Sequence, residues 1–357
     1  MTIQAKISLL EELATTWNEM GFSYGVANGL QGYPETIGRD LDVVFESEKV
    51  EKAVEVTVKF LERKGFLVLP YKLGWPHWIV GIRRDGEDVD SVQVDIFDHL
   101  QWAFCWVVDG IDPAREKVMT GPFQVDPWAC VGKRVFLNGL SGNFSTFEEK
   151  PWYLETTDEE ANSMERNLRR ISGEDDRDLR AAIENRDSSG IRSGFERLRP
   201  KAMKASLRVG KLFRRFHSAW LKQYCFNIHP PYHTPVTTLV GGAETETFGR
   251  KLAALLEQKL PFAVSLKRSP HAARSTLALI KKQHRVRRAS ALIELVILIE
   301  PEDSGGGHRP VFRRMIEGCL RSPDLKIDVT RQTPESAFEK IIDELEGRSR
   351  KADRDRP

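Results

Sequence analysis

Three aspartates in apolar surroundings are the residues of this chain whose spacing can do chemistry. Asp40 and Asp42 lie in the run 38–45, and Asp95 lies in a second apolar run, 92–97. Alternate side chains of an extended strand share one face, so the first two carboxylates are expected to project together. If the two strands are neighbours, all three carboxylates can surround divalent cations, an arrangement typical of phosphoryl-transfer chemistry.

The segments around these aspartates predict alternating helices and strands. Apolar residues at helical spacing predict a helix over 7–20, and residues 24–27 predict a short strand. Residues 28–38 contain several glycines and Pro34, which favour a loop. The other expected elements of the first half are a helix over 47–64, a strand over 66–69, a hairpin with arms 78–83 and 91–97, and an irregular Gly- and Pro-rich stretch over 123–140.

The second half of the chain alternates strands and helices, which favours a parallel sheet. Strands are expected over 236–240, 292–299 and 325–329, and a helix over 247–260. Thr333 and Pro334 are expected at the N-cap and first position of a last helix. The fold class expected is therefore α/β.

Length predicts how the chain is divided, since 357 residues exceed one ordinary core. We expect a first domain over 1–150 and a helical, basic connecting region over 151–228. A second domain is expected over 229–348, and the charged residues 349–357 are expected to be disordered.

Composition indicates a soluble globular protein, with 40% hydrophobic and 30% charged residues. The net charge of +2 gives little reason to expect nucleic-acid binding. The sequence contains neither an apolar run long enough for a bilayer nor a signal-peptide pattern, so we expect a cytoplasmic protein. Four cysteines show no metal-site spacing and are expected to be buried thiols: Cys105, Cys130, Cys225 and Cys319.

Residues 192–222 combine many basic side chains with an apolar stripe that includes Met203, Phe213 and Trp220. One interpretation is attachment to an anionic membrane surface, such as the inner face of the cytoplasmic membrane, to phosphate groups or to a protein partner. The other is a connecting helix whose apolar stripe packs on a domain while its charges are solvated. The sequence leaves both open.

A glycine turn followed by Asp-hydrophobic-Asp on a strand and a later strand aspartate resembles the nucleotidyltransferase superfamily. The matching residues are Gly29, Asp40, Asp42 and Asp95. The resemblance implies that the paired acids hold Mg²⁺ or Mn²⁺ against a nucleoside triphosphate, and that Asp95 completes the site. It also implies that Gly29 lets the backbone approach phosphate. The chain departs from the family at Leu30, where a small hydroxyl residue is usual.

The second half, with its strand His-Thr-Pro-Val-Thr-Thr-Leu-Val-Gly-Gly, resembles a thymidylate kinase-like P-loop domain. A working P-loop ends in Gly-Lys-Ser/Thr, whose lysine neutralises phosphate and whose hydroxyl binds magnesium. Here Glu246, Thr247 and Phe248 hold those positions. Kinase activity is therefore not expected, except through a substitute lysine such as Lys251. The fold expected is thus an α+β nucleotidyltransferase-like domain joined by a basic helical segment to a degenerate parallel-sheet P-loop domain.

Two hypotheses follow for function. The first is a magnesium-dependent enzyme that moves a nucleotidyl group from a nucleoside triphosphate to an unknown hydroxyl or phosphate acceptor. The second is a catalytically inactive adaptor with two decayed nucleotide-binding folds. Fusions of this kind are similar to proteins associated with bacterial surface-polysaccharide synthesis, which implies that pathway for either hypothesis.

Overall fold

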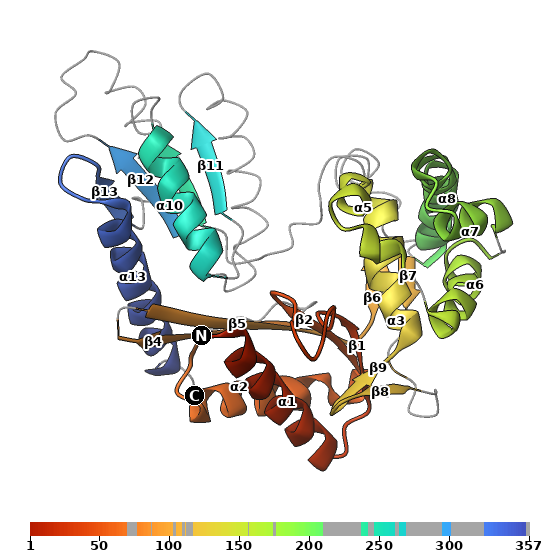
Figure 1. The fold of residues 1–357 in the computed structure, drawn as a ribbon, viewed down its shortest axis with the longest axis horizontal. Helices are drawn as coiled ribbons and strands as arrows, with labels where there is room; N and C mark the ends of the chain where they lie inside the picture. The colour runs from red at the N-terminus through yellow and green to blue at the C-terminus, as the bar shows by residue number, and fades with distance from the viewer. Residues whose placement is uncertain are drawn as a thin grey trace. The chain divides into compact units, whose positions relative to one another are not determined.

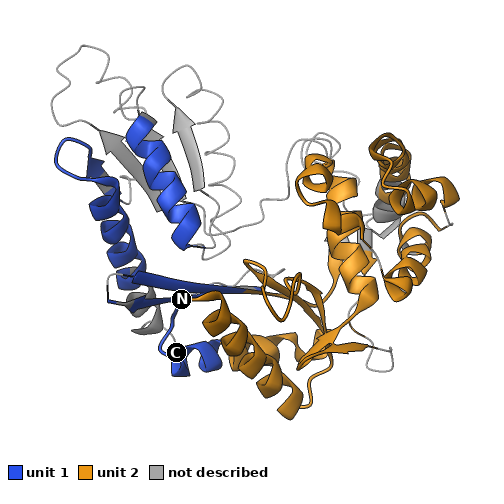
Figure 2. Cartoon of the chain, viewed as in Figure 1, with its two compact units in different colours: residues 1, 58–93, 233–357 blue, residues 2–57, 94–232 orange. Residues whose placement is uncertain are grey.

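The computed structural model describes the following residues: 1–69, 77–86, 88–102, 105–108, 111, 117–155, 157–173, 176–209, 237–241, 246–260, 264–268, 295–300 and 325–354. The chain divides into two compact units, each assembled from separate segments of sequence (Figure 2). Unit 1 contains residue 1, 58–93 and 233–357, and unit 2 contains 2–57 and 94–232.

A mixed sheet of seven strands in the order β3-β4-β5-β2-β1-β9-β8 is the largest sheet (Figure 1). Its central strand β2 is antiparallel to β1 and parallel to β5. The mixed α/β class expected from the sequence is thereby confirmed. The bounds are β1 (Tyr24–Asn28), β2 (Leu41–Phe45), β3 (Leu67–Leu69), β4 (His77–Asp85), β5 (Asp88–Phe97), β8 (Val118–Thr120) and β9 (Phe123–Val125).

Helix α1 (Ile3–Glu19) packs on this sheet through an apolar face spaced at three to four residues. Thr2 caps its start by accepting a hydrogen bond from the Ala5 amide. At its other end the buried Trp17 ring meets Tyr24 and Phe45 edge-on. The 3₁₀ turn η1 (Ser47–Lys49) and helix α2 (Val50–Arg63) follow β2, as the sequence predicts.

The rest of unit 2 is mainly helical. After the hairpin β6 (Leu100–Trp102) and β7 (Cys105–Val108), its elements are α3 (Pro127–Val131), the π-helical turn η2 (Gly132–Leu137), α4 (Asn138–Ser141), α5 (Ser145–Glu149), the 3₁₀ turn η3 (Pro151–Leu154), α6 (Asp158–Ser172), α7 (Arg177–Glu184) and α8 (Ser188–Val209). In α8 the side chains of Ile191, Phe195 and Leu198 are buried, so this part of the basic segment packs inside the unit.

The expectation that residues 123–140 are irregular is wrong, because nearly all of them lie in β9, α3, η2 and α4. Pro127 occupies the first turn of α3, where it needs no amide hydrogen, and Asp126 caps that helix. Gly132 and Gly139 lie where a Cβ atom would collide with Val108 and Phe195. These residues therefore start a helix or allow close packing rather than break structure.

Unit 1 contains a four-stranded sheet in the order β11-β10-β12-β13, in which every neighbouring pair is parallel. This confirms the parallel sheet expected for the second half. The elements are β10 (Thr237–Gly241), α10 (Glu246–Lys259), β11 (Val264–Arg268), β12 (Leu295–Glu300), β13 (Leu325–Asp328) and α13 (Pro334–Arg354). Helix α13 begins where the sequence predicts and includes most of the segment expected to be disordered.

One hydrophobic core joins the early and late segments of unit 1. Helices α10 and α13 contribute residues such as Leu256 and Ile341, and β4 contributes Val80 and Ile82. Arg84 on β4 is paired with three acids of α13, at 2.7 Å from Glu339, 2.5 Å from Asp343 and 2.7 Å from Glu346. The β4–β5 hairpin therefore shares its core with helices that lie far later in the sequence.

The expected boundary at residue 150 falls within unit 2, and the boundary at 229 falls close to His233, where the last segment of unit 1 begins. The separate domains stay a prediction. Cys130 is a buried free thiol, as expected, whereas the side chains of the other cysteines lie outside the described part. Among the described helices none is long and apolar enough to cross a membrane.

Candidate functional site

A row of polar side chains crosses three neighbouring strands of the seven-stranded sheet. Asp42 on β2 is paired in register with Asn28 on β1 and with Asp95 on β5. Residues in register on adjacent strands present their side chains on the same face. Asp42 is fully buried and Asp95 is 5% exposed. The parallel pairing of β2 with β5 is therefore what brings together acids that are distant in sequence.

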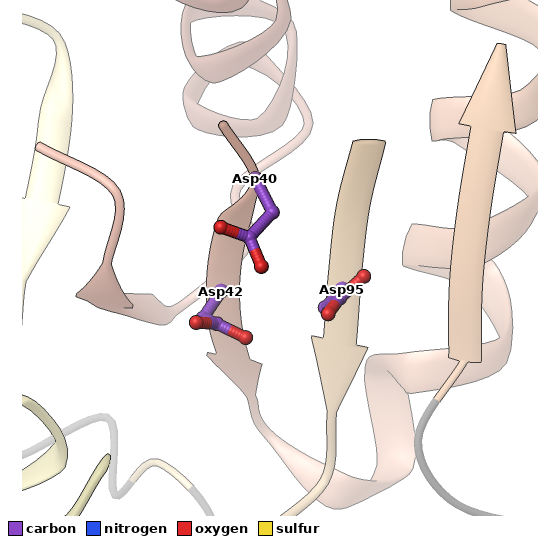
Figure 3. Close-up of side chains that lie close together, drawn as sticks. All are labelled: Asp40, Asp42 and Asp95. Carbon is purple, nitrogen blue, oxygen red and sulfur yellow. The ribbon is translucent and has the colours of Figure 1, made fainter. Parts of the chain in front are cut away.

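Asp40 joins the other two carboxylates although it lies just outside the strand. We expected it on the same strand face as Asp42, but β2 begins at Leu41. Carboxylate oxygens of Asp40, Asp42 and Asp95 nevertheless lie within 4.8 Å of one another (Figure 3). The structure thus brings together all three acids singled out by the sequence.

The loop between β1 and β2 places Asp40 by closing tightly on itself. Gly29 has a φ of +109°, which favours glycine, and its carbonyl accepts a 2.7 Å hydrogen bond from the Gly38 amide. A Cβ atom on Gly38 would lie 2.9 Å from the Gly29 Cα, so the two glycines pack backbone against backbone. Lys6 Nζ from α1 donates to the Gly38 and Arg39 carbonyls at 2.9 and 2.7 Å.

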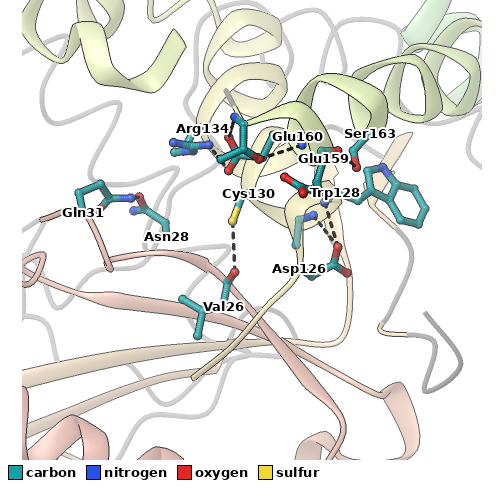
Figure 4. Close-up of polar contacts among 12 residues, drawn as sticks. Val26, Asn28, Gln31, Asp126, Trp128, Cys130, Arg134, Glu159, Glu160 and Ser163 are labelled. Carbon is teal, nitrogen blue, oxygen red and sulfur yellow. Dashed lines mark hydrogen bonds and ion pairs between the residues drawn. The ribbon is translucent and has the colours of Figure 1, made fainter. Parts of the chain in front are cut away.

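A chain of side-chain hydrogen bonds connects the glycine turn to the acids. The Gly29 amide donates to Gln31 Oε1 at 3.2 Å, and Gln31 Nε2 donates to Asn28 Oδ1 at 2.9 Å (Figure 4). Asn28 Nδ2 then donates to Asp42 Oδ2 at 2.9 Å. Leu30 lacks the hydroxyl usual in the family, and the polar group at the Gly29 amide is instead the side chain of Gln31, which the sequence pattern did not single out.

Lys133, on the π-helical turn η2, was also missed. Its ammonium lies 2.8 Å from Asp42 Oδ1 and 4.8 Å from the centroid of the Phe97 ring. The lysine is 23% exposed and the aspartate is 1% exposed, so the ion pair is at the edge of the buried row. The N-cap signature Asp126-Pro127 could have predicted a helix there, but not the contact with Asp42.

Asp40 and Lys6 influence each other's pKa. Burial and the charge of Asp42 raise the pKa of Asp40, against the opposing effect of Lys133 and Lys6. Burial lowers the pKa of Lys6 to about 8, while the Asp40 charge raises it. Two close carboxylates disfavour one another's ionised form, so the cluster gains stability from any cation that enters it.

These residues fit a divalent metal ion by their chemistry. Carboxylate oxygens are the ligands that Mg²⁺ and Mn²⁺ prefer. Asp40, Asp42 and Asp95 can therefore hold a cation, with Asn28 orienting the Asp42 carboxylate through its other oxygen.

The P-loop position of the second half is described only in part. Residues 242–245 lie outside the described residues, and Thr247 and Phe248 lie in the first turn of α10. Neither offers the ammonium of a P-loop lysine. Comparison with known proteins adds nothing to either half, since no family model and no curated protein matches the chain.

Proposed function

We propose that this protein is a magnesium-dependent nucleotidyltransferase. It would move a nucleotidyl group from a nucleoside triphosphate to a hydroxyl or phosphate acceptor. The observation that carries the proposal is the convergence of Asp40, Asp42 and Asp95 beside the tight glycine turn at Gly29 and Gly38. The resemblance of this pattern to the nucleotidyltransferase superfamily supports the same reaction.

Each acid has a distinct role in this proposal. Asp40 and Asp42 hold Mg²⁺ or Mn²⁺, and a bound ion of this kind neutralises and orients the triphosphate oxygens. Asp95 completes the ligand set, and its carboxylate accepts the proton of the acceptor hydroxyl. The amide of Gly29 is a hydrogen-bond donor for phosphate once the Gln31 side chain withdraws from it.

Lys133 holds a positive charge at the site before any metal binds. Its ion pair with Asp42 lowers the cost of burying that carboxylate. With Asp42 holding a metal ion, the ammonium of Lys133 would be available to donate to a phosphate oxygen. Lys133 would thus neutralise Asp42 in the metal-free site and bind phosphate in the site that holds metal and nucleotide.

Calorimetric titration of the four nucleoside triphosphates with Mg²⁺ tests this proposal. We expect wild-type protein to bind at least one of them and the double variant Asp40→Ala, Asp42→Ala to bind none. The fold should survive in the variant because the substitutions relieve repulsion between neighbouring carboxylates. Binding that is equal in both proteins would reject the acids as the site and direct attention to unit 1.

The adaptor hypothesis is the second candidate, and the closed state of the glycine turn favours it. Leu30 replaces the usual hydroxyl, Gln31 covers the Gly29 amide, and Lys133 already neutralises Asp42. An adaptor would bind no triphosphate in the titration above, with or without Mg²⁺. It would instead bind a partner, and that binding would not depend on nucleotide.

The setting of either function is inferred from resemblance. Similar fusions are associated with bacterial surface polysaccharides, so a glycan precursor carrying a hydroxyl or phosphate is the acceptor class to test first. The protein would work in the cytoplasm, peripheral to the inner face of the membrane if residues 192–222 attach there. The apolar contacts of α8 instead favour packing within the protein for the part up to Ala202.

A further inference from the structure

The π-helical turn η2 sends two neighbouring basic side chains in different directions. Lys133 reaches Asp42 on the sheet at 2.8 Å. Arg134 reaches Glu160 on α6, with Nη2 2.5 Å from Oε1 (Figure 4). Both members of the second pair are only 8% exposed. A buried ion pair loses much of its stability when displaced, because either charge alone would be poorly solvated.

The backbone of the same turn is held by a side chain at its end. Asn138 Nδ2 donates to the Arg134 carbonyl at 2.8 Å and to the Lys133 carbonyl at 3.4 Å. A π-helical turn is rare and frequently lies at a functional site. The Asn138 amide therefore stabilises the turn at the two residues whose side chains diverge.

Glycines at the start of η2 and in the following helix α4 pack closely against neighbouring elements. Gly132 lies against Val108 of β7, and Gly139 lies against the Phe195 ring of α8, so closely that neither position has room for a Cβ atom. A side chain at either position would therefore push the backbone away from β7 or α8. Its position on the sheet is thus set by the helical part of unit 2.

We propose that Arg134 and Asn138 are positioning residues that hold the ammonium of Lys133 on Asp42. Arg134 acts from the side, through its ion pair with Glu160, and Asn138 acts through the backbone of the turn. Neither residue touches the acids in the structure. The use of Lys133 toward phosphate rests on the proposed function, whereas its placement on Asp42 does not.

Acylation of lysines by acetic anhydride, followed by peptide mapping in a mass spectrometer, tests the placement in the full-length protein. In the wild type, Lys133 should react more slowly than Lys52. Lys133 is 23% exposed and pairs with a buried carboxylate, whereas Lys52 is 53% exposed and pairs with an exposed one. The double variant Arg134→Met, Glu160→Leu removes the ion pair without leaving a buried charge. We expect Lys133 in this variant to react several-fold faster relative to Lys52.

Two further proteins make the result decisive. Asn138→Ala is a milder change that should also speed acylation of Lys133, and it serves if the double variant fails to fold. Arg83→Met is the control, because it removes an arginine from the buried Asp90 of unit 1, which keeps the Met1 amino group as a partner. Unchanged Lys133 reactivity in both test variants, or an equal rise in the control, would overturn the proposal.

A double-mutant cycle on Mn²⁺ affinity separates an effect that acts through Lys133 from a general loss of stability of the fold. If Arg134 acts through Lys133, the double variant should change Mn²⁺ affinity in the wild-type background and leave it unchanged in a Lys133→Met background. Additive effects would contradict the proposal. If no protein in the series binds Mn²⁺, the proposed metal-dependent function is contradicted. The acylation result still tests the placement of Lys133, because it does not depend on metal binding.

Discussion

At the scale of single residues, Lys133 is a cation built into the acidic cluster. Its ammonium lies on Asp42, where a metal ion is also expected to bind, so the two cations compete. A neutral side chain at this position would leave the carboxylates without that positive charge. The strength of metal binding therefore depends on a residue that is not itself a ligand.

Lys133→Met should raise the affinity for Mn²⁺ by about tenfold, the scale of a coupling between contacting charges. The reason is that the metal no longer has to displace an ammonium from Asp42. Calorimetric titration with Mn²⁺ alone measures the effect. Lys52→Met is the control, because Lys52 pairs with Glu55 at an exposed position. Weaker Mn²⁺ binding in Lys133→Met than in the control would contradict competition.

The pKa of Lys6, on helix α1, depends on the charge of Asp40. Burial lowers its pKa to about 8, and the negative charge of Asp40 partly opposes that shift. Asp40→Asn removes the opposing charge, so the pKa of Lys6 should fall further below its usual range. The titration of the Lys6 side chain by NMR checks this, with Glu11→Gln on α1 as the control. A pKa that stays near 8 in Asp40→Asn would mean that the two groups do not interact.

At the scale of elements, the loop between β1 and β2 depends on two glycines that meet backbone to backbone. A methyl group at Gly38 would lie 2.9 Å from the Gly29 Cα and 3.1 Å from its carbonyl oxygen. Both partners are main-chain atoms and cannot rotate away. The loop can accept a side chain there only by opening, which would move Asp40.

Gly38→Ala should therefore lower the free energy of unfolding by about 1–3 kcal/mol and weaken Mn²⁺ binding. Chemical denaturation and calorimetry measure the two effects. Gly347→Ala is the matched control, since no atom lies within 4 Å of a Cβ there and the residue is inside α13. That change should be neutral or stabilising. Wild-type metal affinity in Gly38→Ala would show that the loop does not position Asp40.

The elements also show what sequence patterns can predict. Asp42 and Asp95 could be predicted to converge because each lies in a short apolar strand. If those two strands pair side by side, their aspartates meet on one face of the sheet. Lys133 and Gln31 could not, because a pattern does not say which side chain a distant turn presents to the acids. The Gly- and Pro-rich composition of residues 123–140 favours irregular structure, but two of its glycines, Gly132 and Gly139, serve close packing instead. In the fold they are points of close contact.

At the scale of the whole molecule, unit 1 is built from segments that lie far apart in the sequence. Val80, Ile82 and Val89 of the β4–β5 hairpin are buried in one core with α10, α13 and β13. Ser91 also donates to the Lys259 carbonyl at 2.9 Å. The hairpin includes the first part of β5, the strand that ends near Asp95. The late segments of the chain therefore support an early strand of the largest sheet.

Leu256→Ala should destabilise this core by about 2–5 kcal/mol, as expected for a fully buried leucine. Because the hairpin shares the core, hydrogen exchange of the amides in 79–82 and 89–91 should quicken. Leu179→Ala is the matched control, since Leu179 is equally buried but lies on α7 of unit 2. Exchange in the hairpin that responds equally to both substitutions would contradict a core shared with the late helices.

The most direct measurement is anomalous diffraction from crystals grown with Mn²⁺ and the triphosphate selected by calorimetry. The proposed function predicts a manganese peak among the carboxylates of Asp40, Asp42 and Asp95, with Lys133 moved from Asp42 toward a phosphate oxygen. A structure in which Lys133 stays on Asp42 and no manganese lies among these acids would contradict it.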